Sequence, residues 1–312
     1  MAYAWFGLVC VIWGSSFILM KKAAVVFGPL TIGAGRVLGG AIVLGVLLGA
    51  TAGWRRRRRQ EGLPPSGAIK FSTWSWRGFG ALWVVVVLGF VYPFSMQPYL
   101  IGRLGQSGFI GMMVCLVPLL TIAASVVLLR VWPSWRQWIG VVVGFAAMPV
   151  LFGVGRELGV SGWEFVLAAT VPLGYAVSNT WVKKTLSHWS PAALTASACA
   201  LAAWVLVPAG LSREKMHIGE VDTATLIAAV GAVLVLGVMG TGVATVLFYR
   251  LVQERGPLFA GMVTYVVPVE ALLLGAMDGE AVTRGQVVAL AVILGCVALV
   301  QWPARKPGAS GA

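Results

Sequence analysis

Ten apolar stretches, each long enough to cross a lipid bilayer, dominate this sequence. A helix of about 20 mostly apolar residues spans the hydrocarbon core of a membrane. Only 11% of the residues are charged, whereas a soluble domain carries about 25%. We therefore predict an all-α integral membrane protein with ten transmembrane helices. The stretches cover roughly 3–20, 30–50, 79–101, 107–129, 135–152, 163–182, 191–211, 223–249, 257–276 and 283–302.

The basic residues between these stretches indicate how the chain is oriented. Most of the 23 Lys and Arg residues, including the run Arg55–Arg59, fall on the side that also carries the C-terminus. Because positive charge accumulates in cytoplasmic loops, both termini are expected in the cytoplasm, with residues 303–312 as a cytoplasmic tail. The net charge of +13 is dispersed over short loops, so it predicts a multi-pass protein of the plasma (cytoplasmic) membrane and no nucleic-acid partner.

The two halves of the chain repeat each other. The segment "WGSSFILMKKAAVVFGP", which begins at Trp13, aligns with "YAVSNTWVKKTLSHWSP", which begins at Tyr175. Each half, 1–152 and 163–302, contains five stretches. Since five is odd, the halves enter the membrane in opposite senses, which predicts two inverted five-helix repeats. Matched positions include Ser16 with Ser178, Lys21–Lys22 with Lys183–Lys184, Tyr99 with Tyr249, Phe109 with Phe259, Gly111 with Gly261, Met112 with Met262, and Pro118 with Pro268.

Small polar and aromatic residues gather at matching depths of these repeats. Inverted repeats with broken helices at the midplane are typical of transporters and mark their binding site. The residues either line a central cavity or join helices by hydrogen bonds, and the two interpretations are compatible. The candidate cavity residues are Trp13, Ser15, Ser16, Tyr92, Gln97, Tyr175, Ser178, Asn179, Thr241 and Thr245.

Glycine and proline residues interrupt the same helices. They act either as hinges or simply as kinks and packing points. The candidate hinge or kink residues are Gly14, Pro93, Pro98, Pro118, Gly240, Gly242 and Pro268.

Two charged residues lie inside predicted spans. Arg36 is about two turns into the second stretch, where it can reach the interface with its long side chain or pair with another group. Glu270 lies in the middle of the ninth stretch, and an acid at that depth is costly and by default a functional candidate. It serves either in proton coupling or as a buried carboxyl bonded to a partner.

The sequence offers little for catalysis. His188 and His217 are isolated in loops, and the four cysteines stand alone within apolar runs. No nucleophile motif, nucleotide-binding loop or cluster of metal ligands occurs. We therefore predict no enzyme, no cofactor and no metal site.

In the order of its motifs the chain resembles the EamA type of the drug/metabolite transporter superfamily. The resemblance rests on "WGSSF" followed by "KK", on "GPLTIGAGRVLGGAIVL", on "QSGFIGMMVCLVPLL" and on "PLFAGMVTYVVPVEALLLGAMDGE", which ends at Glu280. It implies two five-helix bundles around a central pathway and the transport of amino acids, other metabolites or drugs. The first half departs from this pattern, with Leu129–Arg130 where the family places Gly-Glu.

The leading hypothesis is a secondary active transporter, an exporter of small metabolites such as amino acids or of amphipathic drugs. It would act by alternating access around a central cavity between the repeats. One alternative is a lipid or lipid-linked carrier, and another is a membrane scaffold or receptor without transport. The expected partners are a small-molecule substrate and membrane lipid, and the sequence leaves open whether the protein forms a homodimer.

Overall fold

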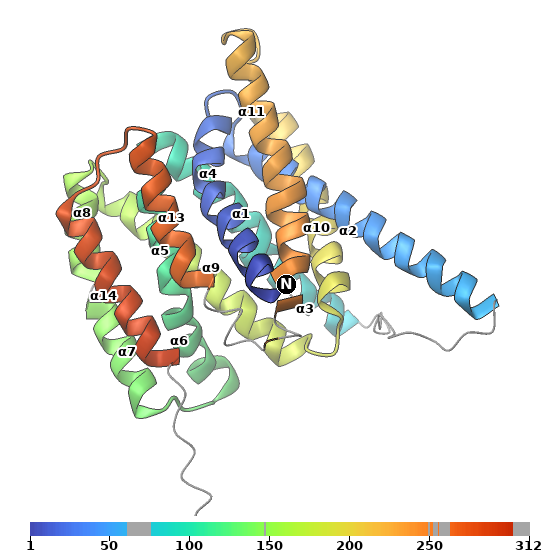
Figure 1. Ribbon diagram of the computed structural model, residues 1–312, viewed down its shortest axis with the longest axis horizontal. Coiled ribbons are helices and arrows are strands. Elements are labelled where there is room, and N and C mark those ends of the chain that lie inside the picture. Colours follow the sequence, from blue (N-terminus) through green and yellow to red (C-terminus); the bar gives the residue numbers. More distant parts are fainter. Residues whose placement is uncertain (61–75, 147, 249, 252–254, 256–262, 302–312) are drawn as a thin grey trace, which may run out of the picture.

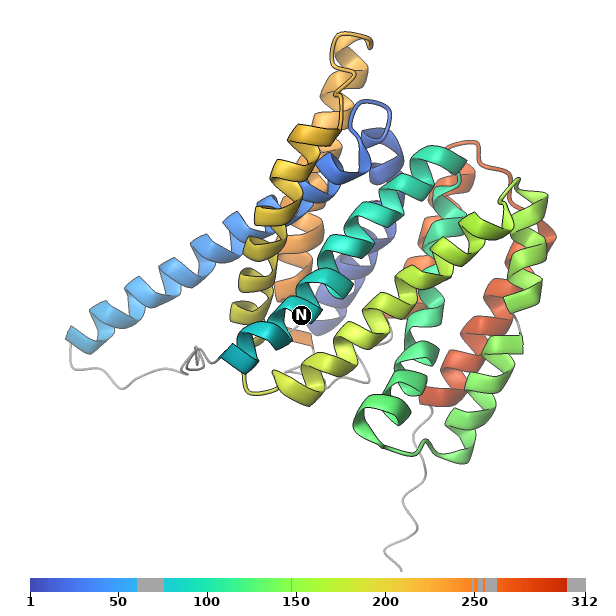
Figure 2. The same ribbon diagram turned by 180° about the vertical axis from the view of Figure 1, so that it is seen from behind.

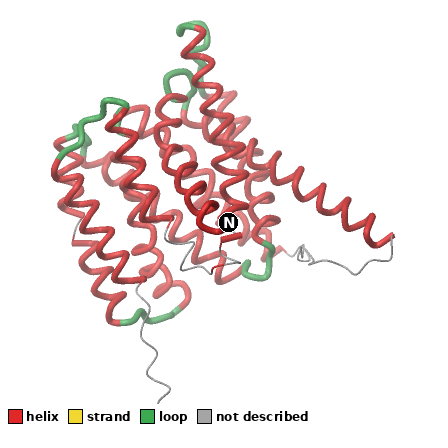
Figure 3. Tube along the Cα trace, in the orientation of Figure 1, coloured by secondary structure: helices red, strands yellow, loops and turns green. Residues whose placement is uncertain are grey.

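The computed structural model describes residues 1–60, 76–146, 148–248, 250–251, 255 and 263–301. Within these residues all regular structure is helical (Figure 3). Seven helices are long and apolar enough to cross a membrane, and two shorter apolar helices, Val263–Met277 and Arg284–Gly295, follow them. The described residues are therefore all-helical and consistent with an integral membrane protein, while the number ten and its division into inverted repeats stay predictions.

The helices follow one another with short links, and several of the predicted spans consist of two or three helical segments. Two segments, η1 and η3, are π-helical, and η2 is a short 3₁₀ turn. In chain order the elements are α1 (Ala2–Ala23), α2 (Pro29–Gln60), α3 (Trp76–Val86), η1 (Val87–Val91), α4 (Tyr92–Leu104), α5 (Ser107–Met113), η2 (Val114–Leu116), α6 (Val117–Leu129), α7 (Trp135–Ala146), α8 (Met148–Glu157), α9 (Gly162–Thr185), α10 (Pro191–Arg213), α11 (Thr223–Val235), η3 (Leu236–Val243), α13 (Val263–Met277) and α14 (Arg284–Gln301).

Local signals in the sequence fix several helix ends. Ser190 caps α10 and Asp222 caps α11, each through a side-chain oxygen that accepts backbone N–H groups of the first turn. Gly105 ends α4 with a φ of 67°, a conformation that glycine adopts without steric cost. The helix α2 continues past the predicted end of its span to Gln60, because arginine is a good helix former.

Corresponding elements of the two halves pack in corresponding ways. The first helix of the first half, α1, packs along α13, and its counterpart α9 packs along α6. In the reverse view α9 also runs beside α4 (Figure 2). The second helices of the halves, α2 and α10, pack on each other, and so do α7 and α14 (Figure 1). Each half therefore supplies part of the surroundings of the other.

The helix α2 crosses the end of α11 and the start of η3 at very short range. A Cβ atom built on Gly39 would lie 2.8 Å from the Cα atom of Gly237, and one built on Gly35 would lie 2.3 Å from Val233. Small residues at a spacing of four let membrane helices approach closely without a strong hydrophobic drive. This crossing sets the position of Arg36, which lies between the two glycines in the sequence.

Several links meet at one end of the bundle, at the top of Figure 1. They comprise residues 24–28, 105–106, 214–222 and 278–283. The backbone N–H of His217 donates to the carbonyl of Val26 at 3.0 Å, which joins two of these links directly. We call this end the Glu280 face.

Candidate functional site

The two π-helical segments occupy matching places in the two halves. The shift of 150 residues that aligns Pro118 with Pro268 carries Val87–Val91 onto 237–241, which lies inside η3. A π-helix widens the turn and changes the backbone hydrogen-bond pattern, and such segments are frequent at functional sites. The interruption predicted around Gly240 is therefore a π-helical turn, whereas the one predicted at Pro93 and Pro98 lies in the α-helix α4, directly after η1.

A serine from the other half packs on the glycine of each π-helix. Ser178 of α9 faces η1, where a Cβ atom on Gly89 would lie 2.6 Å from its Oγ. Ser16 of α1 faces η3, where a Cβ atom on Gly240 would lie 3.5 Å from its Oγ. Both serines are buried. Ser16 and Ser178 are matched in the sequence repeat, but the shift of 150 carries Gly89 onto Met239, so the two contacts are similar and not equivalent.

Trp13 lies beside the second π-helix. Its indole Nε1–H donates to the carbonyl of Gly240 at 2.9 Å, and its ring lies 5.2 Å from that of Phe248. Ser15 and Ser16 both donate to the carbonyl of Ile12, at 3.2 and 2.8 Å. The hydroxyl protons of the two serines are thus directed to their own helix.

Tyr92, Gln97 and Tyr175 form the corresponding polar group between α4 and α9. The Tyr175 hydroxyl donates to Oε1 of Gln97 at 3.4 Å, and the Tyr92 hydroxyl shares a short hydrogen bond with Thr170. Gln97 is 3% exposed, so its amide is removed from lipid and bulk water. Asn179, by contrast, is exposed, although it is one of the predicted cavity residues.

Arg36 is buried between α1, α2, α4 and η3, with an exposed fraction of 8%. Its guanidinium carbon lies 4.1 Å from the centre of the Phe94 ring. Nε donates to Oγ1 of Thr241 at 3.4 Å, and Nη1 contacts Sδ of Met20 at 3.6 Å. The side chain therefore points into the bundle and does not extend to the interface. Thr241 and Thr245 are linked in turn, since Thr245 donates to the Thr241 carbonyl at 2.6 Å.

Glu270 is half-buried against α1. A Cβ atom on Gly14 would lie 2.4 Å from Oε2 of Glu270, so only glycine leaves room for this carboxylate. Within the described part of the chain, Glu270 forms no ion pair or hydrogen bond, and it does not pair with Arg36. The arrangement makes Gly14 a packing position for an intramembrane acid.

The remaining hinge candidates lie at distinct structural breaks. Pro93 is in the first turn of α4 directly after η1, and Pro98 is inside the same helix. Pro118 lies in the first turn of α6 after the 3₁₀ turn, whereas Pro268 lies inside α13. Gly242 packs on α2, where its Cβ atom would lie 2.9 Å from that of Val43. The repeat matches that involve Tyr249, Phe259, Gly261 and Met262 lie outside the described residues.

Among the residues that the structure describes, Glu280 makes the most extensive polar contact between the halves. One carboxylate oxygen accepts bonds from Lys21 Nζ at 2.9 Å, the Ser107 backbone N–H at 2.9 Å and the Ser107 hydroxyl at 2.7 Å. The other accepts from the Gly108 N–H at 2.9 Å. Burial alone would raise the pKa of Glu280, but these donors outweigh it and hold the pKa below its ordinary value. Lys21 also pairs with Asp278 at 2.7 Å.

Two further acids of the second half bind the first half at the same face. Glu214 accepts the backbone N–H groups of Leu30 and Thr31, both at 2.8 Å, and so caps the start of α2. Glu164 pairs with Arg103 at the end of α4. The sequence analysis did not identify these roles. For Glu164 alone the sequence contains a local signal, the capping box that Glu164 forms with Ser161.

Comparison with known proteins identifies the class of this fold. The EamA-like transporter family matches residues 1–153 and 162–302, so nearly the whole chain is covered in two consecutive matches. The chain belongs to the EamA-like transporter family, as its motifs suggested.

Several relatives are similar over most of their length. The chain is 26% identical over 292 residues to an uncharacterized inner membrane transporter, YedA, of Escherichia coli K12, a match that covers 93% of this chain and 87% of the relative. An uncharacterized transporter of Archaeoglobus fulgidus is 22% identical over 170 residues, or 54% of this chain and 58% of the relative. A solved crystal structure matches 99% of each chain with a TM-score of 0.63 and 20% identity, which shows a shared fold.

Proposed function

We propose that this protein is a secondary active exporter of small metabolites or amphipathic drugs. It would work by alternating access around a central site between two inverted five-helix repeats, residues 1–152 and 163–302. The observation that supports this best is a similar contact in each half, a matched serine against a glycine in a π-helix of the other half, Ser178 with Gly89 and Ser16 with Gly240. Two similar contacts can exchange roles when a carrier opens first to one side and then to the other.

In this proposal the Glu280 face is the outer face and both termini are cytoplasmic. Three acids of the second half, Glu164, Glu214 and Glu280, bind groups of the first half there. Such contacts would hold the outer side of the pathway closed, and export would require them to separate. The related membrane transporters support transport as the activity. The direction of transport and the class of substrate are part of this proposal.

Reconstituted protein provides the test. Proteoliposomes are loaded with amino acids, aromatic metabolites and cationic drugs, and flux is measured with and without a pH gradient. We expect Trp13→Ala to lower the flux of transported solutes by more than about tenfold, which corresponds to about 1.4 kcal/mol. Trp132→Ala is the matched control, because that tryptophan is 76% exposed. Absence of flux for every solute would refute the proposal.

Glu270 is the proposed coupling residue. Its half-buried carboxylate, packed on Gly14, has no partner within the described residues that would fix its charge. We expect Glu270→Gln to remove the response of flux to a pH gradient while substrate binding is kept, and Glu157→Gln, at an exposed position, to leave the response intact. Unchanged pH-driven flux in Glu270→Gln would exclude this role.

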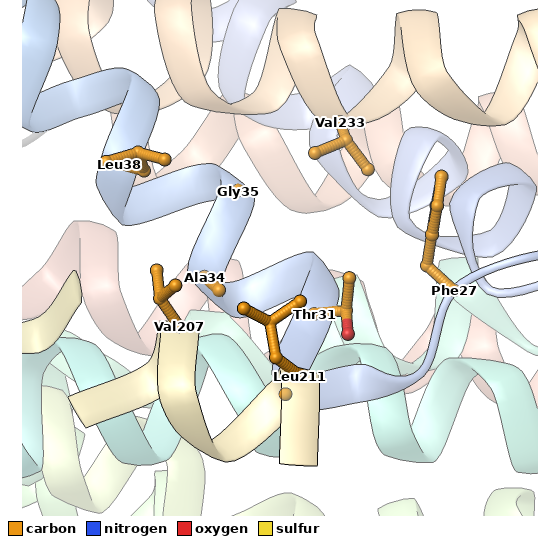
Figure 4. Close-up of a pocket in the computed structure, with 9 residues that line it drawn as sticks. Phe27, Thr31, Ala34, Gly35, Leu38, Val207, Leu211 and Val233 are labelled. Atoms are coloured by element: carbon orange, nitrogen blue, oxygen red, sulfur yellow. The ribbon is translucent and has the colours of Figure 1, made fainter. Parts of the chain in front are cut away.

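A lipid carrier is the second candidate, and one observation favours it. A groove of about 200 Å³ lies between α2, α10 and α11 (Figure 4). Apart from Thr31, its lining is apolar, as hydrocarbon chains require, but it has no charged group for a lipid headgroup. Transfer of a fluorescent phospholipid between leaflets, measured in the same proteoliposomes, distinguishes this candidate. The lining residues are Phe27, Thr31, Ala34, Gly35, Leu38, Val207, Gly210, Leu211 and Val233.

A further inference from the structure

We propose that Arg36 is the subsite for an anionic group of the transported solute, a carboxylate or another small oxyanion. The inference rests on the proposed transport function and specifies its substrate class. It starts from the position of a permanent positive charge within the membrane-embedded bundle. Arginine does not lose its proton in proteins, so the charge of Arg36 has to be balanced by its surroundings.

The protein itself provides no balancing carboxylate among the residues that the structure describes. The acids at the Glu280 face bind Lys21, Arg103 and backbone N–H groups, and Glu270 packs on Gly14 without reaching Arg36. A buried charge without an opposite charge is strongly unfavourable, and natural proteins usually pair it. A substrate anion would supply the missing charge, and only while it is bound.

The contacts of Arg36 orient the guanidinium but use few of its donors. The ring of Phe94 covers one face at 4.1 Å, which leaves the N–H groups free to act in the guanidinium plane. The Nε–H reaches Thr241 Oγ1 only at 3.4 Å, and Nη1 meets a thioether sulfur of Met20 at 3.6 Å. Both acceptors are neutral and weak, and no described group accepts from Nη2. A planar fork of this kind is suited to bidentate binding of a carboxylate.

Other polar groups stand close to this cation. Tyr175 packs against the cluster that contains Phe94, the ring over Arg36, and its hydroxyl donates to the buried amide of Gln97 at 3.4 Å. Arg36 and Gln97 belong to the first half of the chain, Tyr175 and Thr241 to the second. An anion bound among these four residues would contact both halves, as a substrate of an alternating-access carrier must.

Arg36 could instead be a purely structural cation, held by Phe94 and Thr241. The two roles differ in accessibility and in response to anions. A structural cation would be sealed from small reagents or would react with them at a rate that carboxylates do not change. A substrate subsite would react with an arginine-selective reagent when empty and be protected when a carboxylate occupies it.

The experiment measures modification of Arg36 by phenylglyoxal in the purified, full-length protein, with the Arg36 peptide quantified by mass spectrometry. Protection by a pool of phenylalanine, leucine, threonine, benzoate and lactate is compared with protection by the five matching carboxamides. We expect the carboxylate pool to slow modification about tenfold more than the amide pool, a ratio that corresponds to about 1.4 kcal/mol. Equal protection by the two pools, no protection, or no modification of Arg36 would overturn the inference.

Flux measurements separate this inference from the proposed function. We expect Arg36→Gln to lose carboxylate flux by at least about tenfold, Arg36→Lys to retain part of it because the charge is kept, and Arg284→Gln, at an exposed position, to behave as wild type. Carboxylate flux that is unchanged in Arg36→Gln would overturn the anion subsite and leave the transporter standing. Carboxylate protection of Arg36 without flux of any solute would support the anion subsite and refute the proposed transport function.

Discussion

Replacing Glu280 by glutamine preserves the size of the side chain but removes the charge that four donors surround. The carboxylate is 4% exposed and accepts from Lys21, the Ser107 backbone, the Ser107 hydroxyl and the Gly108 backbone at 2.7 to 2.9 Å. A glutamine can still accept on one atom. Its NH₂ group, however, would face the Gly108 N–H, so a donor would meet a donor.

The size of the effect follows from these contacts. A hydrogen bond to a charged group contributes about 1.5–3 kcal/mol and a neutral one about 0.5–1.5 kcal/mol, so neutralising the acceptor costs about 1 kcal/mol per retained bond. Lys21 keeps its pair with Asp278 and is partly exposed, which limits the loss on that side. We expect Glu280→Gln to lower the free energy of unfolding by about 2–4 kcal/mol.

Thermal unfolding of the purified protein in detergent provides the assay. A loss of this size should lower the apparent Tm by about 5–10 °C. Glu157→Gln is the control, since Glu157 is exposed and no hydrogen bond or ion pair of its side chain occurs with the described residues. A shift of Tm equal to that of the control would refute the assignment of Glu280 as a buried contact between the halves.

The pH dependence tests the same contact independently. Because the pKa of Glu280 is lower in the folded than in the unfolded protein, its stabilisation is fully present above the ordinary pKa of glutamate, about 4.3. The stabilisation is lost as the pH falls through the lowered value of the folded state. We therefore expect the difference in Tm between wild type and Glu280→Gln to be largest near neutral pH and to narrow below about pH 4. A difference that stays constant or widens with acidity contradicts the argument.

Two further perturbations test the helix crossing and the orientation. Gly39→Ala would place a methyl group 2.8 Å from the backbone of Gly237, so we expect the free energy of unfolding to fall by about 1–3 kcal/mol. Gly45→Ala in the same helix, with no atom within 4 Å, should leave it unchanged. Equal effects of the two substitutions would contradict the close crossing. Cysteines introduced at Gln60 and His217 should be labelled by impermeant reagents from the cytoplasmic and the outer side respectively, and the opposite pattern would invert the orientation.

The positions of the helices could be predicted from the sequence because apolar length alone sets them. The stretch predicted at 191–211 is α10, Pro191–Arg213, and that at 163–182 is α9, Gly162–Thr185. The interruption around Gly240 was predictable because the chain has few good helix formers there, whereas the one expected at Tyr92–Pro93 lies just after the π-helical segment Val87–Val91. That the helices break as π-helical turns was not predictable, because a π-helix is stabilised by the side chains packed on it, such as Trp13 on the Gly240 carbonyl.

The polar contacts between the halves were beyond a reading of the sequence for a different physical reason. The resemblance drew attention to Gly279 and Glu280 as the end of a helix, which is a local description. The groups that bind the carboxylate come from Lys21 and Ser107, more than 170 positions away along the chain. No periodicity or spacing encodes such a contact, since it depends on how α1, α5 and α13 are packed.

The surroundings of Arg36 show how the predicted and the unpredicted features depend on each other. The sequence places this cation at a definite depth in α2, and the small residues Gly35 and Gly39 allow α2 to approach η3 closely. That approach brings Thr241 to the guanidinium, and the packing of α4 brings Phe94 over its face. The fold therefore orients a positive charge between the two halves, and no carboxylate of the described residues neutralises it. In a carrier whose two halves move against each other, a bound anionic solute would balance the charge of Arg36. The bound solute would then be part of the contact between the halves.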